Sequence, residues 1–212
     1  MTESKLYLYA CSFGKFGTSK GPNAHIWNDE QSFGDVLSRK LNLTLVNRSW
    51  SGGANHHIFL RIMRDVFSNN IKEQDFVIVQ YSFIDRAWCN DVSKTVMPQY
   101  KEFEEYYKLY YSDKMSLLNL VSFNEYLKTK IKCKFVYSFV DKSETLKNTT
   151  VHLYNDFIND HRFFSINGEG PIMYLSSLND EKLFFPLDHH PSADGHKIIA
   201  DLYYDFIRKN HS

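Results

Sequence analysis

Residues 75–81, Asp-Phe-Val-Ile-Val-Gln-Tyr, predict a strand that carries apolar side chains on both of its faces. A strand that is apolar on both faces is typical of a parallel sheet covered by helices on each side. Shorter apolar stretches predict further strands at Lys5–Ala10, Leu43–Val46, Lys134–Phe139 and around Ile172–Leu175. We therefore expect a central parallel sheet of about five strands.

Segments with helical spacing of apolar residues separate these strands. They are Asp29–Leu41, with Asp29 as the helix cap, Ala54–Phe67, residues 113–131, residues 149–163 and Ala193–Arg208. Alternating strands and helices predict a single α/β domain over residues 1–212, with helices on both faces of the sheet. Residues 86–112 interleave Tyr and Trp with charges, which indicates an insertion or lid within that domain.

Charge and composition exclude several classes of protein. The chain has 212 residues, with 25 Lys plus Arg against 25 Asp plus Glu, so a dominant surface for nucleic acid or anionic membrane is not expected. No apolar stretch approaches the ~20 residues of a membrane span, and Met1–Ala10 does not resemble a signal peptide. We expect a cytoplasmic protein. The three cysteines, Cys11, Cys89 and Cys133, lack metal-ligand spacing.

Residues 188–196, Asp-His-His-Pro-Ser-Ala-Asp-Gly-His, provide a candidate base and the carboxylate that would orient it. Pro191 is suited to open a helix, and His190 is favoured over His189 because it directly precedes that proline. Asp188 lies two residues upstream of His190. A metal site made from Asp188, His189, His190 and His196 is the weaker reading, because the spacing matches no standard ligand pattern.

The candidate nucleophile is Ser12, which directly follows the first expected strand; the alternative is a serine that only completes the turn. Cys11 competes for this role, but strand alternation should point it into the core.

Gly52 and Gly53 open a helix, where backbone N–H groups favour a developing negative charge, unless they form only a tight turn. Ser82, or Gln80 nearby, would be a side-chain donor. All these residues follow strands, and the carboxyl ends of parallel strands meet at one edge.

Taken together, these segments resemble the SGNH (GDSL-like) hydrolases over nearly the whole chain. Tyr9-Ala-Cys-Ser12-Phe-Gly is similar to the first block, in a Cys-Ser variant found in phages and marine bacteria; Asn47–Asn55 is similar to the second and residues 188–196 to the last. The resemblance implies a flavodoxin-like three-layer α/β/α fold and a serine esterase, for example a carbohydrate O-acetylesterase. It implies catalytic Ser12, Asp188 and His190, an oxyanion hole from Ser12, Gly53 and Ser82, a small-molecule or carbohydrate ester as substrate, and no metal or organic cofactor.

Two departures from the family pattern keep another class of function open. The last block usually has its Asp three residues before the His, and the third block usually offers an Asn where Gln80-Tyr-Ser82 stands. The alternative is therefore a catalytically impaired SGNH-fold protein with a binding or structural role, such as a virion component, with a homo-oligomeric or virion partner. A flavodoxin-like nucleotide binder is disfavoured, because no Gly-rich phosphate loop follows the first strand.

Overall fold

The computed structural model describes residues 3–18, 27–83, 87–89, 94–96, 113–140, 155, 157–186 and 188–211, with the backbone alone for 87–89, 94–96 and 113–117.

Four strands form the central sheet: β1 (Lys5–Tyr9), β2 (Thr44–Asn47), β3 (Phe76–Tyr81) and β6 (Lys134–Phe139). Their order is β2-β1-β3-β6, and every neighbouring pair is parallel. Leu8 lies opposite Asn47 on one side and Ile78 on the other. All six residues of β3 are buried, as the two-sided apolar pattern predicts. The α/β/α architecture is confirmed, with four strands in the described residues rather than about five.

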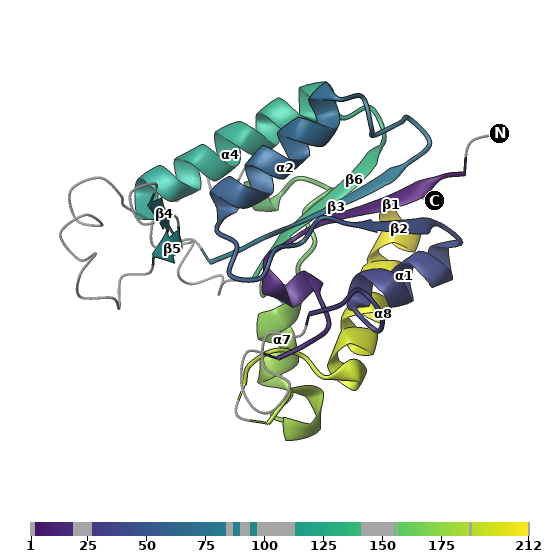
Figure 1. The fold of residues 1–212 in the computed structure, drawn as a ribbon, viewed down its shortest axis with the longest axis vertical. Helices are drawn as coiled ribbons and strands as arrows, with labels where there is room; N and C mark the ends of the chain where they lie inside the picture. The colour runs from purple at the N-terminus through teal and green to yellow at the C-terminus, as the bar shows by residue number, and fades with distance from the viewer. Residues whose placement is uncertain are drawn as a thin grey trace.

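Helices cover both faces of this sheet (Figure 1). On one face lie α2 (Asn55–Phe67) and α4 (Asp113–Lys130), and on the other lie α1 (Phe33–Leu41), α7 (Pro171–Ser177) and α8 (Ala193–His211). Because successive side chains of a strand point to opposite faces of the sheet, the hydrophobic core consists of two layers, one on each face. Tyr7, Tyr9 and Val77 pack with the first layer, whereas Leu6 and Leu8 pack with the second.

The expected fifth strand at Ile172–Leu175 is wrong, because these residues belong to helix α7. Pro171 occupies the first helical turn, where its fixed φ favours the helix and its missing N–H costs nothing. At the open edge of β6, residue Phe163 makes only an isolated parallel bridge to Tyr137. In the described residues, this single bridge is therefore what pairs with β6 at the position of a fifth strand.

Other expected boundaries also need correction. Helix α1 begins at Phe33 and is capped by Ser32, whose Oγ accepts from the Asp35 N–H at 3.2 Å, so Asp29 is not its cap. In the expected helix 149–163, residues 155, 157 and 158 are helical, and Phe163 already bridges to the sheet. Most of the expected insertion at 86–112 lies outside the described residues. Within it, β4 (Ala87–Cys89) and β5 (Lys94–Val96) pair antiparallel.

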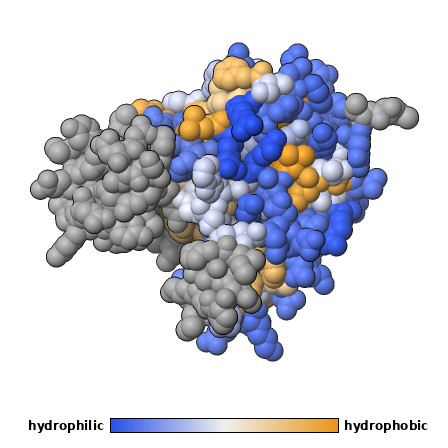
Figure 2. Space-filling model, viewed as in Figure 1, coloured by the Kyte–Doolittle hydropathy of each residue, from blue (hydrophilic) through white to orange (hydrophobic). Residues whose placement is uncertain are grey.

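The face seen in Figure 2 is mostly hydrophilic over the described residues, with a few separate hydrophobic patches. Among the helices described, none is long and apolar enough to cross a membrane.

A buried carboxylate ties the sheet to the segment that follows β2. Asp65 of α2 is 2% exposed and accepts from the Tyr9 hydroxyl at 2.8 Å and from Nδ2 of Asn70 at 2.9 Å. Arg48 adds a bidentate pair, Nε to Oδ2 at 2.9 Å and Nη2 to Oδ1 at 3.1 Å. Burial alone would raise the pKa of Asp65, but these hydrogen bonds lower it overall. Ser12 directly follows β1, and Arg48 directly follows β2. By bonding to both Tyr9 and Arg48, Asp65 therefore holds the ends of these two strands beside the candidate site.

Replacing Asp65 by Asn should lower the free energy of unfolding by about 2–3 kcal/mol, because a charge-assisted network loses its acceptor. We expect less than the full cost of breaking a buried ion pair, since the Arg48 side chain is 41% exposed. Denaturant unfolding measures the change. The control is Glu73→Gln, in an exposed 3.9 Å pair with Lys132, which should shift stability by less than about 0.5 kcal/mol. Equal losses in the two variants would contradict this account of Asp65.

Candidate active site

Ser12 begins a short 3-10 helix, η1 (Ser12–Gly14), directly after β1. This turn is closed by the Gly14 N–H, which donates to the Cys11 carbonyl at 3.1 Å, and by the Lys15 N–H, which donates to the Ser12 carbonyl at 3.0 Å. The Ser12 side chain is 6% exposed, and its Oγ lies 2.8 Å from Nε2 of His190, 178 residues later in the chain. The sheet therefore brings the predicted nucleophile and the predicted base into hydrogen-bond contact.

The other ring nitrogen of His190 contacts Asp188, with Nδ1 2.7 Å from Oδ1. A carboxylate can only accept, so the proton of the neutral ring resides on Nδ1, and Nε2 is left to accept from the Ser12 hydroxyl. Phe13 stacks on the imidazole with ring centroids 4.8 Å apart, and Trp27 meets it edge-on at 4.8 Å. The ring is held by two hydrogen bonds and two aromatic contacts.

Asp188 is itself fixed by two further donors. Its Oδ2 accepts from the Thr18 hydroxyl at 2.8 Å, and its Oδ1 also accepts from the His189 backbone N–H at 2.7 Å. The two-residue spacing before His190 thus still places the carboxylate on Nδ1. Sequence reasoning did not identify Thr18, because a threonine 170 residues away in the chain carries no local signal of this contact. Phe13 and Trp27 were missed for the same reason.

The backbone donors predicted for an oxyanion differ in their availability. No acceptor for the Ser12 N–H is found among the described residues. The Gly53 N–H donates to the Trp50 carbonyl at 2.9 Å, in the turn where Gly52 has a φ of +71°. A Cβ built on Gly53 would lie 3.8 Å from the Cα of Cys11, so this glycine borders the Ser12 turn. Donation from Gly53 to an oxyanion would require sharing its present hydrogen bond.

Ser82 lies at the exit of β3 and is fully buried. Its N–H donates to Oδ1 of Asn55 at 2.8 Å, and Nδ2 of Asn55 returns to its carbonyl at 3.3 Å, which joins α2 to this strand end. The Ser82 Oγ has no hydrogen-bond partner in the described part of the chain. Gln80 is also fully buried. The oxyanion role of Ser82 stays a prediction, since its hydroxyl is covered in this structure.

The remaining candidates take structural positions. Cys11 is fully buried in the core, as predicted, but it packs with Leu8 and Ala10 rather than on the Tyr9 face that strand alternation would give, because β1 ends at Tyr9. His57 caps α2, because its Nδ1 accepts from the Ala54 N–H at 3.0 Å. His196 is fully buried in α8, where its Nδ1 accepts from the Phe33 N–H at 3.1 Å at the start of α1. Among the described residues, no group of three or more His, Cys, Asp or Glu side chains is arranged to hold a metal ion.

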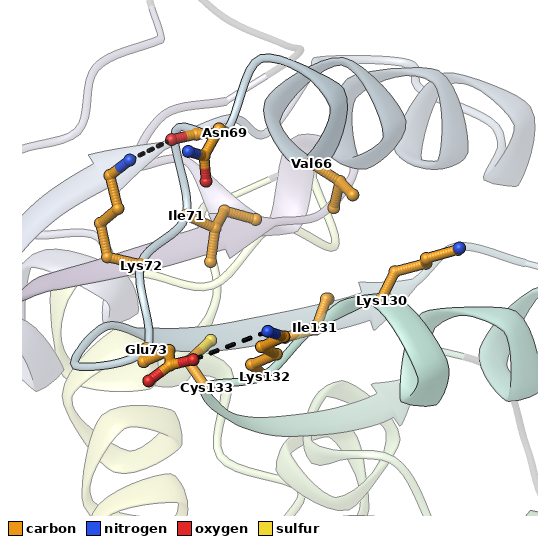
Figure 3. A pocket seen from close by; sticks show the side chains of 9 residues that line it. All are labelled: Val66, Asn69, Ile71, Lys72, Glu73, Lys130, Ile131, Lys132 and Cys133. Atoms are coloured by element: carbon orange, nitrogen blue, oxygen red, sulfur yellow. Dashed lines mark hydrogen bonds and ion pairs between the residues drawn. The ribbon is translucent and has the colours of Figure 1, made fainter.

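A cavity of about 260 Å³ lies beside the residues that lead into β3 and β6 (Figure 3). It is at the amino-terminal ends of these strands, whereas Ser12 follows the carboxyl end of β1. Figure 3 shows Lys132 directed at Glu73, a 3.9 Å pair, and Lys72 directed at the Asn69 carbonyl. Burial raises the pKa of the Cys133 thiol to about 12, so it stays protonated at neutral pH. Its described lining residues include no nucleophile paired with a base.

The comparisons with known proteins agree with this geometry at the level of the fold. No family model matches the sequence, and no significant match is found among curated proteins. Among solved structures, the chain is similar to a protein from Desulfitobacterium hafniense DCB-2 assigned to the lipolytic G-D-S-L family (TM-score 0.60, 12% identity, 96% of this chain and 99% of that one). It is also similar to the psychrotrophic esterase EstA from Pseudoalteromonas sp. (0.59, 11%, 98% and 98%). A third is an acetyl xylan esterase from Butyrivibrio proteoclasticus (0.56, 14%, 97% and 64%). The chain therefore has the fold of these three proteins.

The buried His196 predicts a pH dependence of stability. Burial, with a smaller contribution from His190, lowers its pKa to about 3, below the ~6.5 of an unfolded histidine. The unfolded state then binds the extra proton first, so stability falls as the pH drops from about 6.5 towards 3, by at most about 1.4 kcal/mol per pH unit. In His196→Asn, which keeps an acceptor for the Phe33 N–H, denaturant unfolding should show a flatter dependence. The exposed control His189→Asn should keep the wild-type slope, and an unchanged slope in both variants would refute the assignment.

Proposed function

We propose that this protein is a serine ester hydrolase. The observation that carries the proposal is the hydrogen-bonded series in which Ser12 Oγ lies 2.8 Å from His190 Nε2 and Asp188 Oδ1 lies 2.7 Å from His190 Nδ1. This arrangement of nucleophile, base and orienting carboxylate is what acyl transfer through a serine requires. The solved structures with this fold that carry esterase names support the proposal.

In the proposed reaction, Ser12 Oγ attacks the ester carbonyl while its proton passes to His190 Nε2. Asp188 stabilises the imidazolium that forms. Collapse of the tetrahedral intermediate breaks the bond to the alcohol oxygen, which takes the proton from His190, and leaves an acyl group on Ser12. Water, deprotonated by the same imidazole, then attacks this acyl-enzyme and releases the carboxylic acid and free Ser12. The Ser12 N–H, with Gly53 and Ser82 after local adjustment, would stabilise the oxyanion.

We propose acetyl esters of carbohydrates as the substrate class, supported by the likeness to the acetyl xylan esterase from Butyrivibrio proteoclasticus. The surroundings of His190 suit a small acyl group, because Phe13 and Trp27 crowd the imidazole on two sides. With these contacts the His190 side chain is 13% exposed, and partial burial strengthens its hydrogen bonds to Ser12 and Asp188.

The rival is the same fold in a binding or structural role without turnover. It is favoured by one observation: of the three predicted oxyanion donors, Gly53 is already bonded to Trp50 and Ser82 is covered. Each absent donor typically costs ~10²–10³ in turnover. We favour the hydrolase because an idle fold gives no reason for both nitrogens of one imidazole to be engaged between a serine and a carboxylate.

Hydrolysis of p-nitrophenyl acetate separates the two. Ser12→Ala and His190→Ala should each lower kcat by about 10⁴-fold or more, and Asp188→Asn should lower it less, because orienting the base matters less than being it. Ser177→Ala, an exposed serine on α7, is the matched control and should retain wild-type turnover. Wild-type rates in the Ser12 and His190 variants would eliminate the mechanism.

Thr18 should act as a positioning residue through Asp188. Thr18→Val removes the 2.8 Å hydrogen bond at nearly constant shape, so kcat should fall about 10–150-fold, the value of one hydrogen bond to a charged group, with KM little changed. Thr18→Ser retains a hydroxyl and should restore most of that loss. The pH profile of kcat should also shift in Thr18→Val, because the carboxylate that stabilises the imidazolium is less well held. A purely structural role would instead give equal losses with Val and Ser and an unshifted profile.

A further inference from the structure

A cavity of about 270 Å³ adjoins the proposed nucleophile on the β2 side of the sheet. Its lining consists of two indoles, two cationic side chains and three small polar ones: Trp27, Trp50, Lys15, Arg61, Asn47, Ser49 and Ser51. The volume is close to the ~300 Å³ at the lower end of small-molecule sites. Among the described residues, no carboxylate contributes to the lining.

This cavity is built from the residues that position Ser12. Trp27 lines it and also contacts the His190 ring. Asn47 donates from Nδ2 to the Gly14 carbonyl at 2.8 Å, and Ser49 packs so closely that a Cβ on Gly14 would lie 2.1 Å from its Oγ. A molecule bound here would therefore lie beside the turn that carries Ser12 and against Trp27, which contacts the base.

Arg61 has donors that meet no acceptor in the part of the chain that the structure describes. Its Nη1 donates to the Arg48 carbonyl at 2.7 Å and more weakly to the Ser49 carbonyl, whereas its Nε and Nη2 have no hydrogen-bond acceptor among the described residues. The guanidinium lies 4.3 Å from the Trp50 ring, which fixes its plane. Burial, together with the charges of Arg48 and Arg64, lowers the pKa of Arg61, so a nearby anion would relieve a desolvated and repelled charge.

The positive character continues beyond this cavity. An adjoining one, of about 320 Å³, shares Trp50 and Arg61 and adds Arg64. The acidic residue at its wall, Asp65, is already bonded to Arg48 and its other donors. On the other side, Lys15 contacts Asp29 only at 3.5 Å, through a carboxylate that is half exposed. In a chain of zero formal charge, these cations concentrate a positive potential beside the proposed nucleophile.

We propose that this cavity is a subsite for a carboxylate-bearing sugar ring, so that the substrate is an ester of an acidic carbohydrate. Arg61 and Lys15 receive the carboxylate, and the indoles of Trp27 and Trp50, which line the cavity, contact the ring. The planar guanidinium, whose Nε and Nη2 have no acceptor among the described residues, matches a carboxylate in the two-bond geometry that arginine favours. This inference rests on the proposed esterase function, since it assigns the bound ring to the alcohol part of the ester.

The test compares two substrates that differ only in charge, methyl O-acetyl-glucuronide and methyl O-acetyl-glucoside. The wild type should show a kcat/KM at least about tenfold higher for the glucuronide, the value of one charge-assisted pair. In Arg61→Gln and in Lys15→Gln the ratio between the two substrates should fall towards one, mainly through KM for the glucuronide. Arg39→Gln, an exposed arginine on α1, is the matched control and should keep the wild-type ratio. Two variants are used because Arg61 also supports the Arg48 carbonyl, so its loss alone could disturb the fold.

Failure of this inference is distinguishable from failure of the esterase function. If Ser12-dependent hydrolysis of p-nitrophenyl acetate is present but the two sugars react equally well, the subsite is refuted and the esterase stands. If no ester is hydrolysed, calorimetry of Ser12→Ala with methyl glucuronide and methyl glucoside still tests the subsite. Binding of the glucuronide that is weakened by Arg61→Gln in this background supports the subsite, and equal or absent binding of both sugars overturns it.

Discussion

A single imidazole, held at both of its nitrogens, is the interaction on which the site depends. His190 contacts a serine that follows the first strand and a carboxylate that precedes the last helix, and both distances are below 3 Å. Ser12 lies at the carboxyl edge of the parallel sheet because it follows β1, and the segment before α8 brings Asp188 and His190 to the same edge. Since carboxylates only accept, the contact with Asp188 also determines the tautomer and leaves Nε2 aimed at Ser12. A shift of one residue in the segment that holds Asp188 and His190 would remove both contacts of the imidazole.

The segment around Asp188 and His190 has little regular structure of its own, and side chains from elsewhere hold it. Thr18 fixes the carboxylate, and Phe13 and Trp27 fix the ring. These three residues come from the first part of the chain, so the position of Asp188 and His190 near the C-terminus depends on contacts with residues near the N-terminus. The same part of the chain adjoins the cationic cavity, where Trp27 contacts the base on one side and the proposed subsite on the other. Recognition of the alcohol and positioning of the base would thus share one indole.

Much of the fold could be predicted from periodicity alone, because the core strands have strong patterns. Residues 75–81 carry apolar side chains on both faces, and the strand lies there in the structure. Prediction failed where the signal was short: Ile172–Leu175 is apolar enough for a strand, but Pro171 starts a helix there. The meeting of Ser12, Asp188 and His190 could be predicted because each follows or precedes a regular element. The Thr18 contact could not, since it depends on how a loop returns to the site. The bond from the Gly53 N–H to Trp50 is likewise a property of the turn geometry and not of residue type.

Covalent labelling with a fluorophosphonate probe, followed by mass mapping of the modified peptide, measures whether His190 activates Ser12. A serine whose proton is taken by His190 should attack the phosphorus, displace fluoride and retain the probe, so we expect one equivalent of label on Ser12 and none on Ser12→Ala or His190→Ala. Absence of label on the folded wild type, or equal labelling of the wild type and Ser12→Ala, would show that Ser12 is not an activated nucleophile.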